Sequence, residues 1–379
     1  MGDVGPLDGV RVVDLSAIIS GPLATMLLAD QGADVIKVEP PGLGDLLRYI
    51  GSSRGGMSGL FAMCNRGKRS VVVDLKTDDG RASVRKLIDD ADVVVQNFRP
   101  GAVERLGLGY DDVRASNPGV IYVSISGFGA DGPYAGKRVY DNVVQGYSGF
   151  AAVQADASGN PTLLRTLVCD KVTAYTAAQA ITAALFARTR TGEGQHIEVT
   201  MFDAAVAFLW PDAAMDMALL ESDTVRHATV GAGYTALAMA DGFITTGAVS
   251  DSEFQGLCRA LGRDDVADDP RFATLPGRVE HIAALAEADL AGTASKMAVA
   301  DFLAAAEAND VPAAPLQRLE DVPSDPQAIA RQLFTVTDHP AVGRLRQVRP
   351  PARFSSTPSR IGGPAPALGQ HTAEVLGSG

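Results

Sequence analysis

Cysteine and histidine are scarce in this 379-residue chain, which holds 3 cysteines and 5 histidines. The cysteines form no CxxC pair and the histidines no HxxxH pair, so neither a disulfide framework nor a metal site is expected, and the thiols fit a reducing compartment. No apolar run approaches the roughly 18 residues that span a bilayer. The N-terminus also lacks the basic and apolar regions of a secretory signal. We therefore expect a cytoplasmic protein with no membrane partner.

Positive charge is in deficit, with 33 Lys and Arg against 45 Asp and Glu and a net charge of −12. Proteins that bind nucleic acid are normally basic, so nucleic acid is not expected as a partner. A GxGxxG fingerprint is missing after the first predicted strand, where the sequence reads DLSAIISGP, and a P-loop is missing too. These absences disfavour a nicotinamide-dependent oxidoreductase and a P-loop nucleotide enzyme.

Short runs rich in Val and Ile alternate with helical stretches over the first 130 residues. The runs cover residues 10–15, 34–39, 70–75, 92–98 and 120–125, and the helical stretches between them cover residues 22–31, 78–90 and 110–117. Runs of this kind suit strands that are buried on both faces, and the alternation favours parallel pairing. The sequence therefore predicts an α/β fold, a Rossmann-like parallel sheet covered by helices, followed by a long helix at 170–190 and a strand at 196–201.

The composition changes in the second half of the chain, which predicts a division into domains. Residues 1–215 form the predicted large domain, and residues 225–325, richer in Ala and acidic side chains, form a predicted smaller α/β domain. Within the smaller domain we expect a strand at 242–247 and a helix at 251–262. Residues 326–379 are predicted to return to the large domain, with a Pro-rich, extended part at 344–368.

Basic side chains gather in and near the segments that follow the predicted strands. Ligands of such sheets bind beyond the carboxyl ends of the strands, and phosphates need cations together with free N–H donors. The candidates are Arg66, Lys68, Arg69, Lys76, Arg99, Arg105, Lys137 and Arg138. Their placement predicts a ligand that carries adenosine and phosphate groups.

Asp170 stands at the predicted start of the long helix, after a largely apolar run. The ordinary role of an acid there is to cap the helix. A carboxylate in this place is also favoured by the helix dipole and can attack an activated carbonyl to form a covalent acyl intermediate. Neighbouring Cys169 is a rival nucleophile, although no histidine stands near it in the sequence to activate it. Asp141, directly after Tyr140, is either a solvated loop acid or an acid–base or positioning partner.

The order and spacing of many short motifs resemble the class III CoA-transferases, the group of formyl-CoA transferase and carnitine CoA-transferase. The resemblance is dense over residues 6–210 and weaker from there to the end. The motifs are PLDGVRVVDLS, SGPLAT, LADQGADVIKVEPPGLGD, NRGKRSVVVDLK, VVVQNFRPGAVERLGLGYDDV, YVSISGFGADGP, RVYDNVVQGYSG and LVCDKVTAYTAAQAITAALFARTRTGEGQHIEVTMFDA.

This resemblance implies an enzyme that transfers coenzyme A from an acyl-CoA donor to a carboxylic acid acceptor. It implies acyl-aspartyl anhydride and aspartyl-CoA thioester intermediates on Asp170, with Tyr140 and Asp141 as further catalytic residues. Coenzyme A is then a substrate, no cofactor is tightly bound, and the protein is an interlocked homodimer. The residues implied to contact coenzyme A are Ala17, Ile18, Ser20, Lys76, Asn97, Phe98, Arg105 and Arg138.

Two departures from the formyl-CoA type leave the acid substrates open. Ile19 stands where that type has a glutamine, and residues 247–250 (GAVS) replace a run of glycines.

The sister group, the 2-methylacyl-CoA racemases, places a histidine where this chain has Tyr140. Moving an α-proton needs an acid and a base on the two faces of the carbon, and tyrosine, with a pKa of about 10, replaces imidazole poorly. The transferase interpretation is therefore favoured, with a racemase or a non-catalytic acyl-CoA-binding protein as alternatives.

Overall fold

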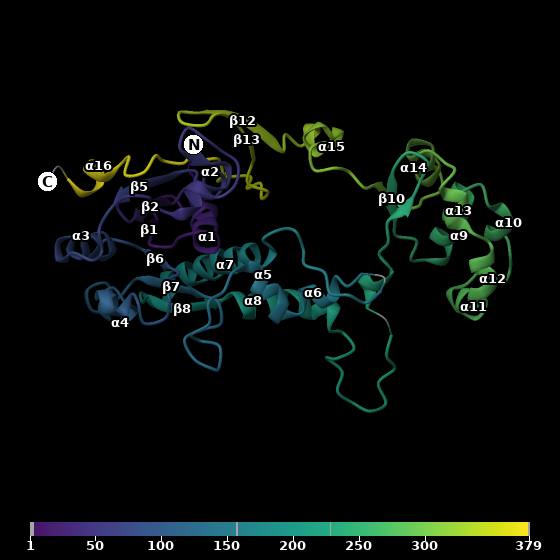
Figure 1. Cartoon of the computed structure of the whole chain (residues 1–379), viewed down its shortest axis with the longest axis horizontal. Helices are drawn as coiled ribbons and strands as arrows, with labels where there is room; N and C mark the ends of the chain where they lie inside the picture. Colours follow the sequence, from purple (N-terminus) through teal and green to yellow (C-terminus); the bar gives the residue numbers. More distant parts are fainter. Residues whose placement is uncertain (1–3, 157, 228, 378–379) are drawn as a thin grey trace. The chain divides into compact units, whose positions relative to one another are not determined.

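The computed structural model describes residues 4–156, 158–227 and 229–377, and its chain divides into two compact units (Figure 1). Unit 1 comprises the chain up to Leu220 together with the segment from Ala330 onward, and unit 2 comprises Glu221–Ile329. The polypeptide therefore leaves unit 1 once, builds unit 2, and returns.

A six-stranded sheet forms the centre of unit 1, and all of its strands are parallel. The strands are β1 (Arg11–Asp14), β2 (Asp34–Glu39), β5 (Lys68–Val72), β6 (Val93–Gln96), β7 (Ile121–Ser126) and β8 (Gln195–Thr200), in the spatial order β5-β2-β1-β6-β7-β8. The prediction of a parallel sheet is confirmed. The order reverses between β1 and β6, and ligands of such sheets bind beyond the carboxyl strand ends at this switch point.

Helices cover both faces of this sheet. The helices α1 (Ser20–Ala29) and α7 (Val168–Thr191) pack on one face, and α3 (Asp78–Asp89) and α4 (Tyr110–Ser116) pack on the other. Successive strand residues point to opposite faces, so Val12 joins the cluster under α1 and α7 while Val13 joins the cluster under α3 and α4. This double burial explains why the central strands β1 and β6 are rich in valine.

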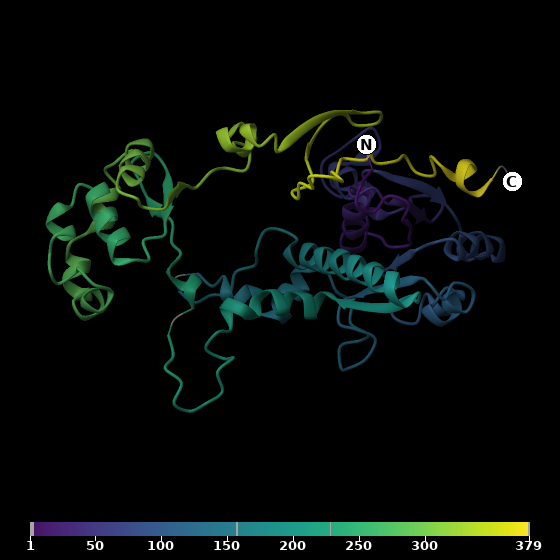
Figure 2. The same cartoon turned by 180° about the vertical axis from the view of Figure 1, so that it is seen from behind.

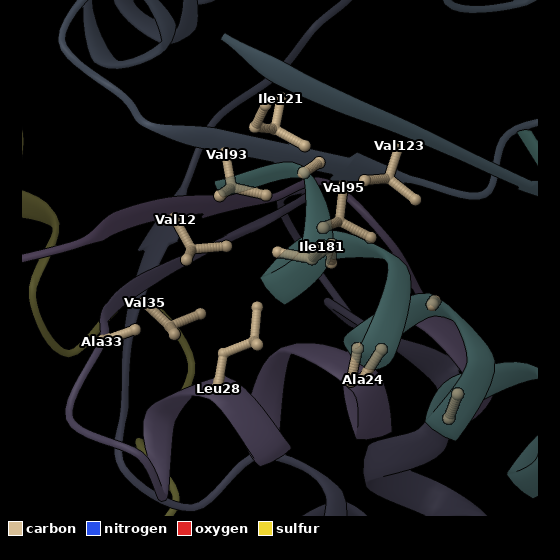
Figure 3. Packing of buried hydrophobic residues seen from close by; sticks show 14 of the residues in the cluster. Val12, Ala24, Leu28, Ala33, Val35, Val93, Val95, Ile121, Val123 and Ile181 are labelled. Carbon is tan, nitrogen blue, oxygen red and sulfur yellow. The ribbon is translucent and has the colours of Figure 1, made fainter. Parts of the chain in front are cut away.

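The contact between α1 and α7 is built from small and branched apolar side chains (Figure 3). Ala24 and Leu28 of α1 and Ala174, Ala177 and Ile181 of α7 are all fully buried in one cluster. Small residues let two helices approach closely, which fixes their relative position. The beginnings of these two helices carry the candidate site described below.

The remaining elements of unit 1 before the crossing to unit 2 are short, apart from α8. They are the strands β3 (Ser53–Arg54) and β4 (Met57–Ser58), the helices α2 (Gly59–Cys64), α5 (Asp141–Ser148), α6 (Phe150–Val153) and α8 (Met201–Ala213), and the 3-10 helices η1 (Leu46–Tyr49) and η2 (Glu104–Leu106).

The C-terminal segment, which belongs to unit 1, is joined to the N-terminal part of that unit by backbone hydrogen bonds. After α15 (Pro326–Ala330) it forms a hairpin of β12 (Phe334–His339) and β13 (Gly343–Val348), and it ends in α16 (Thr372–Leu376) beside β5 (Figures 1 and 2). Gly67 donates its N–H to the Gly363 carbonyl at 3.1 Å, and His371 donates its N–H to the Ser70 carbonyl at 2.9 Å. These bonds tie the segment to the neighbourhood of β5.

Unit 2 has a three-stranded antiparallel sheet with helices packed around Ile244 and Phe302, which are fully buried. Its strands are β9 (Leu237–Ala238), β10 (Phe243–Thr246) and β11 (Ala313–Pro315), and its helical elements are η3 (Val230–Gly233), α9 (Asp251–Ala260), α10 (Asp264–Ala267), α11 (Leu275–Glu280), α12 (Ile282–Glu287), α13 (Leu290–Ala294), α14 (Val299–Ala308) and η4 (Val322–Ser324). In the described part of the chain, every helix is too short or too polar to cross a bilayer.

Candidate active site around Asp170

Asp170 lies in the first turn of α7, and only 9% of the residue is exposed. The helix begins at Val168, and its N-cap residue Leu167 makes no side-chain hydrogen bond. Asp170 is therefore not the cap of this helix, and the helix-cap interpretation is wrong. Its carboxylate is a buried acid that needs a different explanation.

Asp141 supplies the cap that Leu167 lacks. It is the first residue of α5, it is buried, and its Oδ2 accepts the backbone N–H of Asp170 at 2.9 Å. Its Oδ1 accepts a bond from Nε2 of Gln145 at 2.6 Å. One carboxylate oxygen of Asp141 thus holds the backbone of Asp170 and the other holds the side chain of Gln145, as expected of a residue that positions its neighbours.

The beginning of α1 faces the same carboxylate. The side chain and the backbone N–H of Ser20, the first residue of α1, hydrogen-bond to Asp170. The N-cap residue Ile19 gives no side-chain bond and Pro22 has no N–H, so the backbone N–H of Gly21 is the one in this first turn without a partner among the described residues. Helix N-termini favour negative charge, and Asp170 therefore lies where two of them meet.

Gly21 makes this arrangement possible. A Cβ built on Gly21 would lie 2.3 Å from both Cβ and Oγ of Ser16, a distance that no side chain tolerates. Only glycine therefore lets the loop after β1 fold closely onto the start of α1.

Burial and the nearby Asp141 carboxylate together raise the pKa of Asp170 to about 7, although the bonds from Ser20 act in the opposite direction. Within the described residues, Asp170 forms no ion pair with a Lys, Arg or His. The protonated and the anionic forms of Asp170 therefore both occur near neutral pH, and the anion has no cationic partner among the described residues. Cys169 is buried, and burial followed by the two acids raises its thiol pKa to about 12, so it stays protonated and is a poor nucleophile.

The loop between β1 and α1 is held in a strained conformation. Ile18 has a φ of 69°, a left-handed conformation that costs a branched residue on the order of 1–3 kcal/mol. Asp45 compensates, because its carboxylate accepts the Ile18 N–H at 3.1 and 3.2 Å and pairs with Lys37 at 3.0 Å. The side-chain amide of Asn97 exchanges two bonds with the backbone of Ala17, at 2.9 and 2.8 Å. The loops after β1 and β6 are thereby joined at the switch point.

Two cavities of unit 1 meet at Asp170, and both are lined by Asp170, Ile18 and Tyr140. The first has a volume of about 510 Å³ and the second about 670 Å³. Tyr140, predicted as a catalytic residue, is 71% exposed at their junction. The remaining lining of the first cavity is Ile19, Leu46, Leu47, Ile50, Leu60, Asp141, Asn142, Gln145, Leu164, Arg165, Thr166 and Leu167.

The second cavity is basic where the first is aliphatic. It is lined by Arg99, Lys137 and Arg138 together with the predicted residues Ser20, Asn97 and Phe98. Lys137 donates to the hydroxyl of Tyr147 at 2.6 Å and lies 4.1 Å from the ring centre of Tyr134. Arg99 and Arg138 form no ion pair with any described residue, so their guanidinium groups are available to a phosphate.

The structure does not bring all the predicted contacts together. Lys76 and Arg105 are exposed and line neither cavity, so the cavities give no support for their predicted contact with coenzyme A. Three other candidate cations are occupied in ion pairs, Arg66 with Asp30, Lys68 with Asp14, and Arg69 with Asp34. Clustering in the sequence could not separate these structural pairs from free cations.

Sequence reasoning missed three residues that the geometry singles out: Asp45, Gln145 and Arg165. Asp45 and Gln145 act through backbone groups of distant segments, which no local pattern reveals. Arg165 could have been noticed, since it stands in the short segment directly before α7. Among the described residues, no group of three or more His, Cys, Asp or Glu side chains is placed to hold a metal ion.

Comparisons with known proteins agree over almost the whole chain. The family described as CoA-transferase family III matches residues 7–372. The chain is 39% identical to a succinate–glutarate CoA-transferase of Agrobacterium fabrum, over 98% of this chain and 95% of the relative. It is 37% identical to an acetyl-CoA:oxalate CoA-transferase of Acetobacter aceti, over 87% and 85%. A solved structure of a CaiB/BaiF family protein from Brucella suis is similar with a TM-score of 0.85 and 36% identity, covering 98% of each chain.

Proposed function

Because this chain belongs to CoA-transferase family III, we propose that it moves coenzyme A from an acyl-CoA to a carboxylic acid through covalent intermediates on Asp170. One observation carries the proposal. The Asp170 carboxylate is buried, has no cationic partner among the described residues, and lies where a basic and an aliphatic cavity meet. That is the place where a thioester would lie if its two halves occupied the two cavities.

The first half of the reaction loads coenzyme A onto the enzyme. A carboxylate oxygen of Asp170 attacks the thioester carbonyl of the donor, the C–S bond breaks, and an anhydride and the CoA thiolate form. The thiolate then attacks the Asp170 carbonyl carbon, the C–O bond breaks, and the donor acid leaves as a carboxylate. Asp170 now carries coenzyme A as a thioester, and no net proton has moved.

The second half repeats these steps with the acceptor. The acceptor carboxylate attacks the Asp170 thioester and expels the CoA thiolate, which then attacks the acceptor carbonyl of the new anhydride. This releases the product acyl-CoA and restores the Asp170 carboxylate. The backbone N–H of Gly21 at the beginning of α1 can stabilise the charge on the tetrahedral oxygens, and burial of Asp170 limits hydrolysis of the anhydride.

The second cavity suits the coenzyme. Arg99 and Arg138 offer guanidinium groups to phosphates, and Asn97 and Phe98 line the same cavity at the switch point of the sheet.

We also propose that the protein forms an interlocked homodimer. Light scattering tests this, because the dimer should have twice the mass of the 39.4 kDa chain. A monomer at assay concentrations that still transfers coenzyme A would contradict this assembly.

Racemisation is not favoured by this site. It needs a second acid–base group opposite Asp170, and Asp141 already accepts hydrogen bonds at both oxygens. Tyr140 lies at the cavity junction, where the racemases that the chain resembles place a histidine. Incubation with a 2-methylacyl-CoA in D2O would show deuterium at the α-carbon without any acceptor acid if the racemase alternative held.

The proposal is tested by mass spectrometry of the enzyme after incubation with a panel of acyl-CoAs. We expect the peptide that contains Asp170 to gain the mass of coenzyme A minus water, and hydroxylamine to remove this adduct. Asp170→Asn should show no adduct and no exchange, while still binding acyl-CoA. Exchange that persists in Asp170→Asn, or an adduct on another residue, would contradict the assignment.

A further inference from the structure

In the described part of the chain, the first cavity is lined by one cationic side chain, and its other charged lining residues are the acids Asp141 and Asp170. Eight of the lining residues are Ile or Leu, and Arg165 is the one Lys or Arg among the described residues that line it. Arg165 is an exposed residue that lines this cavity, and it forms no ion pair with any described residue. An arginine at the wall of a largely aliphatic cavity, without an ion-pair partner among the described residues, can bind an anionic group.

The backbone around Arg165 is fixed by the same residue that holds Asp141. Gln145, which is buried, accepts the N–H of Leu164 at 2.9 Å and donates to the carbonyls of Leu164 and Thr166 at 3.2 and 3.3 Å. It therefore clamps the residues on both sides of Arg165. Since Gln145 also donates to Asp141, Arg165 and the nucleophile are positioned by one connected set of hydrogen bonds.

Phosphate groups of the coenzyme have a better place elsewhere. The second cavity holds Arg99, Lys137 and Arg138, whereas the first cavity offers one guanidinium among aliphatic side chains. An aliphatic wall with one cation suits an acyl chain that carries one negative charge away from the thioester. The reacting carbonyl of the acyl group would lie beside Asp170, so a carboxylate that pairs with Arg165 is a second acid group at the far end of the chain.

Resting on the proposed function, we propose that Arg165 selects acyl groups with a carboxylate at the far end, so that the substrates of this site are dicarboxylic acids and their monothioesters. The names of two relatives, a succinate–glutarate enzyme and an acetyl-CoA:oxalate enzyme, each include a dicarboxylic acid, but neither name says which residue recognises it. Arg165 acts in substrate specificity. It pairs with the distal carboxylate while the aliphatic residues cover the methylene groups between the two ends.

The test compares succinyl-CoA with butyryl-CoA as donors, since these differ in a terminal carboxylate against a methyl group. For the wild type we expect kcat/KM to favour succinyl-CoA. In Arg165→Gln, kcat/KM for succinyl-CoA should fall roughly 30-fold or more, while kcat/KM for butyryl-CoA stays within about twofold, because only the first substrate loses a charge-assisted pair. Arg165→Lys should restore part of the preference. Arg114→Gln, an exposed arginine of α4 outside both cavities, is the matched control and should change neither value.

The two proposals fail in different ways. If Arg165→Gln lowers kcat/KM by the same factor for both donors, or lowers it for neither, the proposed role of Arg165 is overturned while coenzyme A transfer stands. The proposed function itself is overturned if the wild type transfers coenzyme A from neither donor to any acid. Retained activity with butyryl-CoA shows in the same experiment that Arg165→Gln is folded.

Discussion

Two buried carboxylates near the carboxyl end of the sheet have opposite surroundings. Asp14, the last residue of β1, is fully buried, and its Oδ2 lies 2.9 Å from Nζ of Lys68. Burial alone would raise its pKa, but Lys68 and Lys37 outweigh burial and hold it at about 2. Asp170 is buried near another acid and has no ion-pair partner in the described part of the chain, and burial and this acid raise its pKa to about 7. Burial is common to both, and the neighbours decide which acid is structural and which is reactive.

The two carboxylates affect the free energy of unfolding in opposite ways: ionised Asp14 stabilises the folded chain, and ionised Asp170 destabilises it. The Asp14 pKa is lower in the folded chain than in the unfolded one, so this acid stabilises the fold above about pH 4 and loses that effect as the pH falls toward 2. The Asp170 pKa is higher in the folded chain, so raising the pH from about 4 through 7 removes stability. The same isosteric change from Asp to Asn should therefore have opposite consequences in the two regions.

The largest effect is expected for catalysis in Asp170→Asn. An amide cannot form the anhydride, so exchange should fall by roughly a thousandfold or more. Initial rates of coenzyme A exchange and acyl-CoA affinity, measured on the same preparation, check this. Retention of a tenth of the wild-type rate, after wild-type contamination is excluded, would place the nucleophile elsewhere.

Asp14→Asn should mainly affect the fold. It leaves Lys68 and Lys37 buried without their shared acid, and we expect a loss of roughly 3 to 5 kcal/mol in the free energy of unfolding. Denaturant titration at pH 7 measures it. The idea of a structural role fails if Asp14→Asn is as stable as the wild type yet inactive.

Asp170→Asn should also stabilise the protein, in contrast to Asp14→Asn. Above pH 7 the wild type must keep a charge buried beside Asp141, so the variant should gain roughly 1 to 3 kcal/mol at pH 8. The gain should shrink toward pH 4, where Asp170 is protonated in the folded wild type. Thermal unfolding at both pH values gives the answer, and a pH-independent difference would speak against a raised pKa.

The smallest expected effect concerns Asp141→Asn. Removing this charge takes away one cause of the raised Asp170 pKa, so the midpoint of the pH–rate profile should move from about 7 to lower pH. Activity at pH 8 should drop less than in Asp170→Asn, because the Asn oxygen can still accept the Asp170 N–H. A profile with an unchanged midpoint would show that burial alone sets the pKa.

The sheet and its helices could be predicted because their signals are local. Valine-rich runs and helical stretches marked β2 with its observed bounds, Asp34–Glu39, and α3 within one residue, Asp78–Asp89. The family could be recognised as well, because the motifs keep their order along the chain. Asp170 was identified as a candidate for the same reason, although its helix begins earlier than expected, at Val168.

What the sequence could not show are the relations between distant segments. Nothing in the sequence near Arg66, Lys68 or Arg69 shows that each is paired with an acid of another segment, whereas Arg99 and Arg138 form no ion pair with a described residue. The left-handed Ile18 was equally hidden, because a branched residue is normally excluded from that conformation and only the bond from its N–H to Asp45 reveals how it is held. The single cation of the first cavity becomes visible only when its aliphatic neighbours are brought together from the segments at 18–19, 46–60 and 164–167.

The most direct test of Asp170 as nucleophile follows its oxygen atoms. With an acceptor acid labelled with oxygen-18 in its carboxylate, each turnover should leave one labelled oxygen on Asp170, because the acceptor oxygen that forms the anhydride stays with the aspartyl carbonyl. Mass spectrometry of the digested enzyme should find the label on Asp170 and not on Asp141. Efficient exchange of coenzyme A with no label in Asp170 would contradict the covalent route.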